Sequence, residues 1–151
     1  MKRSILILVI IITLACNREK TFSKAILKNK AGVEYCAILP NIRLEQNVEI
    51  TQAEIEKIDS LVSKSFDSIV SVVELKIGQK SGLKLDAYKL QYIPSINKEN
   101  HLIINVNGLS EPEEYDWKNT IYSGGGGGQR IFTGEFDLET GKGILAFNGA
   151  L

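Results

Sequence analysis

The sequence predicts an α+β domain in which one long amphipathic helix packs on a curved antiparallel sheet of four to five strands. Apolar residues recur every three or four positions over 55–73, which is the period of a helix with one buried face. After residue 85, apolar and polar residues alternate in short runs separated by turn-forming residues, which is typical of antiparallel strands. We therefore expect the helix to cover one face of the sheet and the other face to be partly wet.

The expected helix has a clear start signal. Thr51 and Glu54 form a capping box, in which each side chain can bond the backbone amide of the other residue. Gly78 closes the region, and β-branched valines before it weaken the end of the helix. These signals predict a helix over 51–73. Its expected buried face consists of Ile55, Ile58, Val62, Phe66, Ile69 and Val73.

The expected strands lie on both sides of this helix in the chain. A short strand over 33–39 comes first and stops at Pro40. Two alternating runs, 85–93 and 102–107, flank a polar turn and predict a hairpin, with Lys89 and Gln91 on its polar face. Two more runs, 129–138 and 144–148, flank a glycine-containing turn. By analogy alone, a helix followed by simple hairpins suggests a roll of the cystatin-like or helix-grip type.

The first sixteen residues have the layout of a bacterial lipoprotein signal peptide. Lys2 and Arg3 precede an apolar run over 5–12, and Ala15 stands directly before Cys16. The run is too short to cross a bilayer, which takes about 20 apolar residues. The residues before Cys16 resemble a lipobox, which implies cleavage before Cys16 and lipidation of its thiol. An ordinary secretory signal and an uncleaved anchor are the alternatives.

This reading divides the chain into three parts. Residues 1–15 are the expected signal peptide, 16–30 a lipidated N-terminus and tether, and 31–151 a single α+β domain. Cleavage leaves 136 residues with 16 basic and 18 acidic side chains, a net charge near −2. This balance gives no electrostatic case for binding nucleic acid. We expect attachment to a membrane of the cell envelope through the lipid, on a periplasmic or outer-membrane face.

Catalytic and metal signatures are weak. Cys36 lies in an apolar run, which favours a buried thiol over a reactive one. His101 is the only histidine, so one chain cannot build a site with two histidine ligands, and neither it nor Cys36 lies in a nucleophile motif. The five glycines at 124–128 lack the Lys-Ser/Thr of a phosphate loop and predict a wide connection that is disordered unless something binds it. We expect no cofactor.

Two loops carry the remaining candidate residues. The loop over 108–118 contains Glu113, Glu114 and Asp116, which do not have the spacing of a calcium loop. Tryptophan and tyrosine are favoured at recognition surfaces. We therefore expect a partner-binding surface formed by the exposed face of the sheet with the loops at 108–118 and 123–129. Its candidate residues are Trp117, Tyr122, Gly126 and Arg130.

The second half of the chain resembles a group of small lipoproteins of Bacteroidetes bacteria that have no known activity. The residues that carry the resemblance are 88–94, 96–98, 103–107, Trp117-Lys118, a glycine-rich turn before Phe132, and 147–150. The resemblance implies lipidation and the hairpin at 85–107, and it implies no catalytic residue.

Three functions follow as hypotheses. The first is a non-enzymatic, lipid-anchored module that binds another macromolecule, with an envelope protein as its expected partner. The second is an envelope hydrolase or ligand-binding enzyme that uses carboxylates of the acidic loop in a cavity between helix and sheet. The third is an inhibitor or immunity lipoprotein, although the glutamine-valine-glycine wedge of cystatins is absent from the sequence.

Overall fold

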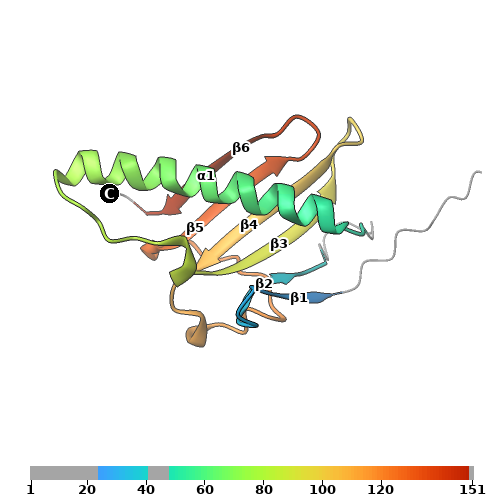
Figure 1. Cartoon of the computed structure of the whole chain (residues 1–151), viewed down its shortest axis with the longest axis horizontal. Helices are drawn as coiled ribbons and strands as arrows, with labels where there is room; N and C mark the ends of the chain where they lie inside the picture. Colours follow the sequence, from blue (N-terminus) through green and yellow to red (C-terminus); the bar gives the residue numbers. More distant parts are fainter. Residues whose placement is uncertain (1–23, 41–47, 150–151) are drawn as a thin grey trace, which may run out of the picture.

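The computed structural model describes residues 24–40 and 48–149, and in them one helix covers one face of an open six-stranded sheet (Figure 1). Cys16, the expected signal peptide and the first part of the expected tether lie outside the described residues. The elements in chain order are β1 (Ala25–Lys28), β2 (Glu34–Ile38), α1 (Gln52–Ile77), β3 (Lys89–Ile96), β4 (Leu102–Leu109), β5 (Gly128–Asp137) and β6 (Lys142–Asn148), with short 3₁₀ turns at Leu85–Ala87 and Pro112–Glu114.

The strands lie in the sheet in the order in which they occur in the chain, from β1 to β6. Every neighbouring pair is antiparallel except β2 and β3, which run parallel because α1 crosses over between them. The α+β prediction is confirmed. The number of strands is six rather than four to five, and the sheet is open rather than curved into a roll.

The strand that the sequence did not predict is β1. It pairs with β2 at the edge of the sheet. The sequence gives only a weak strand signal here, because the short apolar run lies between Lys24 and Lys28. This strand lies within the range 16–30 that was expected to be tether. The ordered domain therefore begins by residue 25 and not at residue 31.

Helix α1 starts where its capping box predicts. The Thr51 amide donates to Glu54 Oε2 at 2.7 Å, and the Glu54 amide donates to the Thr51 hydroxyl at 3.3 Å. The helix ends at Gly78, whose φ of 70° is the left-handed conformation of a C-terminal glycine cap. Its last residue, Ile77, lies four positions beyond the predicted end, because the burial of Val73 outweighs the low helix propensity of the valines.

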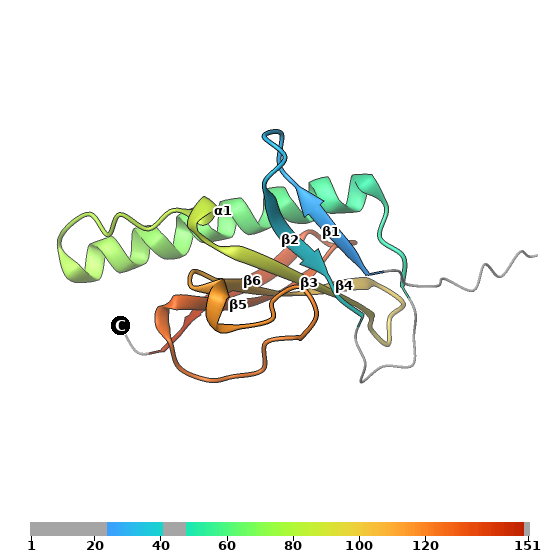
Figure 2. The same ribbon diagram turned by 90° about the horizontal axis from the view of Figure 1, so that it is seen from below.

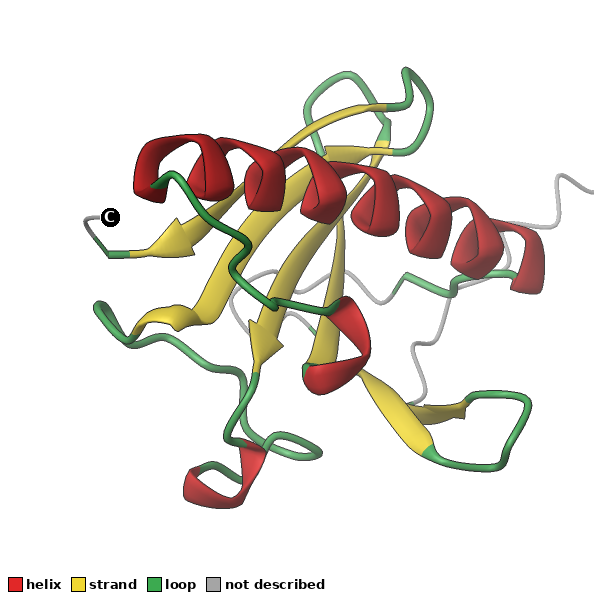
Figure 3. Ribbon diagram, turned by 60° about the vertical axis from the view of Figure 1, so that its left-hand side comes forward, coloured by secondary structure: helices red, strands yellow, loops and turns green. Residues whose placement is uncertain are grey.

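Helix α1 lies across one face of the sheet (Figure 3), and the side chains between the helix and the sheet form the main core. The alternation of the strands is confirmed, because the side chains expected to face inward all lie in this core. Phe66 of α1 is at its centre, with ring centroids 5.4 Å from both Tyr88 and Phe132 and 6.0 Å from Phe147. The other buried core residues of the strands and their ends are Cys36, Ile38, Leu90, Tyr92, Leu102, Ile104, Val106, Phe136, Leu138 and Leu145.

One polar junction crosses this core. Asp59 of α1 accepts hydrogen bonds from the Tyr35 hydroxyl on β2 at 2.8 Å and from the Tyr92 hydroxyl on β3 at 2.6 Å. Burial raises the pKa of Tyr92 well above 10, so its hydroxyl stays protonated and donates. The carboxylate thus ties the helix to the two parallel strands.

Phe66→Ala should destabilise the domain by about 3–5 kcal/mol, since it removes a fully buried aromatic ring and leaves a cavity between helix and sheet. Urea unfolding followed by circular dichroism measures this change. Leu75→Ala on the same helix is the control, because Leu75 is 83% exposed and its loss should change stability by less than about 0.5 kcal/mol. Equal effects of the two substitutions would contradict the assigned core.

Candidate binding surface

The second face of the sheet is covered by the β4–β5 loop, residues 110–127. Figure 2 shows this loop on the side of the sheet opposite to α1. Beneath it lies a second, smaller core formed by Ala37, Leu39, Ile93, Leu109, Trp117 and Ile131. The expected partly wet face is therefore largely dry where the loop crosses it.

The buried amide of Gln91 holds this loop in place. Its nitrogen donates to the carbonyl oxygens of Trp117 and Thr120, each at 2.8 Å. Its oxygen accepts from the Tyr122 amide at 2.9 Å and from the Asn107 side chain at 3.1 Å. Every hydrogen-bonding group of the Gln91 amide is thereby used, as a fully buried amide requires. The sequence placed Gln91 on the polar face and did not predict this role.

Trp117 is not a surface residue. It is 8% exposed and packs into the smaller core, so the expectation that it is an exposed residue is wrong, whereas its contact with a partner stays a prediction. The acidic neighbours Glu113 and Asp116 are exposed, whereas the indole packs against residues of the sheet. Trp117 instead anchors the loop by apolar burial, next to the hydrogen bonds of Gln91.

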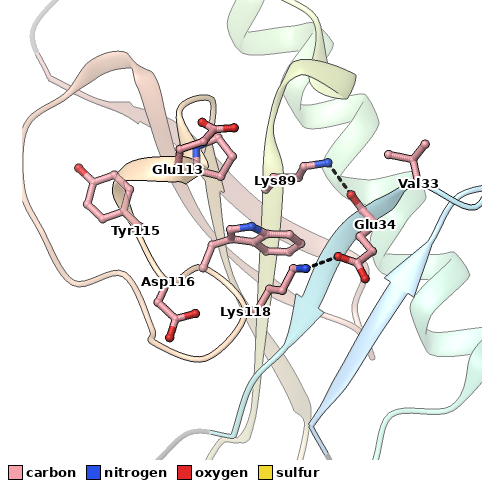
Figure 4. Close-up of a pocket in the computed structure, with 9 residues that line it drawn as sticks. Val33, Glu34, Lys89, Glu113, Tyr115, Asp116 and Lys118 are labelled. Carbon is pink, nitrogen blue, oxygen red and sulfur yellow. Dashed lines mark hydrogen bonds and ion pairs between the residues drawn. The ribbon is translucent and has the colours of Figure 1, made fainter.

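A shallow hollow of about 470 Å³ lies beside Trp117 and is lined by charges of both signs. Figure 4 shows Glu113, Tyr115 and Asp116 of the loop on one side, with Lys89, Lys118 and Glu34 on the other. The two lysine ammonium groups lie 5.9 Å and 5.6 Å from the centre of the Trp117 ring.

These lysines are already occupied. Lys118 forms an ion pair with Glu34 and holds the pKa of that carboxyl below 4.5. Lys89 donates to the Glu34 carbonyl oxygen at 2.5 Å. The positive charges of the hollow are therefore already engaged within the protein.

The acidic loop does not lie where the enzyme hypothesis needs it. Glu113 and Asp116 are exposed on the loop side of the sheet, and the space between helix and sheet is filled by the main core. Asp116 also accepts from the Asn119 side chain at 2.6 Å. The side chain of Glu114 lies outside the described residues. Among the described residues, no acidic-loop carboxylate lies in a cavity between helix and sheet.

The other predicted contact residues lie at the margin of the loop. Tyr122 is half-buried and meets the exposed Tyr115 edge-on, with ring centroids 5.3 Å apart. Arg130 is exposed and forms an ion pair with Glu111 at 2.7 Å. Gly126 has a φ of 83° and open space around it, so the backbone there uses a conformation that favours glycine. Disorder of the glycine run in the absence of a ligand stays a prediction.

A larger groove, which we call the amide groove, lies between the same loop and the sheet. It has a volume of about 800 Å³. Its walls come from β3, β4 and the two residues after β2 on one side, and from the end of the loop on the other. The lining residues are Leu39, Pro40, Ile93, Asn105, Asn107, Asn119, Thr120, Ile121, Tyr122 and Ser123.

Cys36 and His101 are far apart. Cys36 is fully buried, which raises the pKa of its thiol well above 9 and keeps it protonated. It pairs with Leu90, which in turn pairs with Gly108, seven positions along the chain from His101. At about 3.3 Å per residue this separates the two side chains by roughly 20 Å, too far for a nucleophile and its base.

His101 instead bonds Asp137 across the end of the sheet, with 2.8 Å between Nδ1 and Oδ2. This hydrogen bond raises the pKa of His101 above 6.5. Backbone donors of the following turn, Thr140 foremost, and His101 lower the pKa of Asp137 to about 2. The favourable pair is present between these two pKa values: it weakens as His101 deprotonates at higher pH and as Asp137 protonates near pH 2.

No protein-family model, curated protein or solved structure matches this chain. Across residues 24–40 and 48–149, no three side chains of His, Cys, Asp or Glu gather closely enough to hold a metal ion. In the same two ranges, none of the helices has the length and apolar character needed to cross a membrane.

Gln91→Leu should release the β4–β5 loop, because it leaves two loop carbonyls and the Tyr122 amide without their buried partner. We expect a loss of about 3 kcal/mol in stability and a red shift in the emission of Trp117, which is the only tryptophan. Gln52→Leu at the exposed start of α1 is the matched control and should change neither quantity. An unshifted Trp117 emission in the Gln91 variant would contradict the role of the network.

Asp137→Asn should lower the pKa of His101 toward 6.5, since it removes the charge that the protonated imidazole faces. An NMR titration of the single histidine measures this shift directly. Glu139→Gln, which removes a more distant carboxylate, should lower the pKa by less. The pairing would be refuted by a His101 pKa that is the same in the parent protein and in Asp137→Asn.

Proposed function

We propose that this protein is a lipid-anchored, non-enzymatic binding module of the bacterial cell envelope, and that the β4–β5 loop is its recognition surface. The observation that carries the proposal is the long loop fixed across one face of the sheet by the Gln91 amide. The loop connects two adjacent antiparallel strands, β4 and β5, which a turn of a few residues could join. Its 18 residues are thus far more than the sheet needs.

Loops of this length in compact domains usually serve function. A rigid scaffold beneath a loop also favours binding, since the loop loses less conformational freedom when a partner docks. Here the backbone is held at Trp117, Thr120 and Tyr122, while the side chains of Tyr115, Asn119 and Thr120 are exposed. The buried part of the loop supplies rigidity and the exposed part is available for contact.

The anchor rests on the sequence of the first sixteen residues and agrees with the resemblance to Bacteroidetes lipoproteins. Lys24, where the described structure begins, follows Cys16 by eight residues. A fully extended chain spans at most about 3.5 Å per residue, so lipidation of Cys16 would hold the domain within roughly 28 Å of the bilayer. The partner or ligand would then be an envelope component close to that surface.

Cys16→Ala tests the anchor. The parent protein should sediment with membranes and incorporate radiolabelled palmitate, whereas the variant should do neither. Palmitate labelling that survives the substitution, or a parent protein found only in the soluble fraction, would contradict lipidation at Cys16.

The recognition surface is tested by crosslinking in cells, followed by capture and mass spectrometry. We expect one dominant envelope partner, retained by Leu75→Ala on the helix side and reduced by Tyr115→Ala and Arg130→Ala on the loop side. These three side chains are exposed, so the substitutions should leave the fold intact. Capture that is lost only in Leu75→Ala would place the surface on the helix instead.

A further inference from the structure

We propose that the amide groove binds a neutral oligosaccharide. This inference rests on the proposed function only in taking the loop side of the sheet as the binding face. It assigns a ligand chemistry to a site for which neither the sequence nor the comparisons suggest one.

The groove is built on a rigid floor. Leu39 and Ile93 form its apolar base and are almost fully buried. Asn107 stands beside them, and its nitrogen donates to Gln91 and to the Tyr122 carbonyl at 3.1 Å and 3.2 Å. The volume of the groove, about 800 Å³, falls within the range of sites for small ligands. A ligand would enter a site whose walls are already positioned, which lowers the entropic cost of binding.

The lining contains no charged side chain, although charged residues are frequent elsewhere on the loop. Asn105, Thr120 and Ser123 line the groove, and within the described residues their side chains form no hydrogen bond. An amide and a hydroxyl each offer both a donor and an acceptor. A ligand that satisfies them must also carry both kinds of group.

Sugar hydroxyls meet this requirement, since each donates and accepts without bearing charge. A charged ligand would instead lose hydration in the groove without gaining an opposite charge. The apolar side chains of Ile93 and Ile121, together with the ring of Tyr122, match the C–H faces of a pyranose. The combination of uncharged polar rim, apolar floor and aromatic side chain thus favours a neutral glycan.

An extended peptide fits the groove less well. Peptides that add to a sheet use the free backbone groups of an edge strand. The groove lies over β3 and β4, each of which already has a neighbouring strand on both sides. A peptide there would have only side chains to bind and no backbone ladder.

The test is native gel electrophoresis of the detergent-solubilised full chain through gels that contain dextran, xylan, mannan or a soluble β-glucan. A gel with polygalacturonate tests for binding through charge. We expect at least one neutral polysaccharide to retard the protein and polygalacturonate to have no effect. Asn105→Ala combined with Thr120→Ala should weaken the apparent affinity by about tenfold or more. The matched control is Ser63→Ala with Ser68→Ala on the exposed side of α1, which should bind as the parent does.

Migration unaffected by all four neutral polysaccharides would overturn the inference, as would equal retardation of the groove variant and the parent. Retardation by polygalacturonate alone would mean a charged ligand and would also overturn it. If crosslinking still captures an envelope protein in that case, the proposed binding function stands and only the glycan assignment fails. If neither a polysaccharide nor a protein is bound, both fail.

Discussion

The side chain of Gln91 is the constraint on which the second layer of this structure depends. Its amide is fully buried on an interior strand, so each of its donors and acceptors must find a partner inside the protein. Those partners are backbone groups of the β4–β5 loop and the amide of Asn107. The position of Trp117 and the far wall of the amide groove both follow from this one set of hydrogen bonds.

The two faces of the sheet are thus stabilised by different means. On the helix side, apolar side chains of α1 and of alternate strand positions form a continuous core, and shape and burial provide most of the stability. On the loop side, a smaller apolar cluster is combined with directional hydrogen bonds to the backbone of a loop. Directional bonds fix a loop that is irregular apart from the short 3₁₀ turn at Pro112–Glu114. They leave its outer side chains free to contact a ligand.

The parts of this architecture that could be predicted are those with a local signal. The capping box at Thr51 located the start of α1, and strict alternation identified the helix-facing residues of the hairpins. Gln91 could not be recognised, because it alternates with Leu90 and Tyr92 just as a solvent-facing glutamine does. Its partners are backbone atoms some thirty residues later, and backbone groups leave no trace in a sequence. The acidic residues beside Trp117 favoured a surface position, and no local signal showed that its side chain is buried. The amide groove could not be predicted either, because it brings together residues of β3, β4 and the loop that are far apart in the sequence.

Hydrogen exchange at the Tyr122 amide tests most directly whether Gln91 fixes the loop, because this amide donates to the Gln91 oxygen at 2.9 Å. The neighbouring amide of Ser123 is the internal reference, since no backbone or side-chain acceptor bonds it among the described residues. In NMR exchange measurements on the native protein, the Tyr122 amide should exchange far more slowly than that of Ser123, at a rate close to those of the β3–β4 ladder. A Tyr122 amide that exchanges as fast as Ser123 would show that the loop is not held to the sheet, and would contradict both the binding surface and the groove.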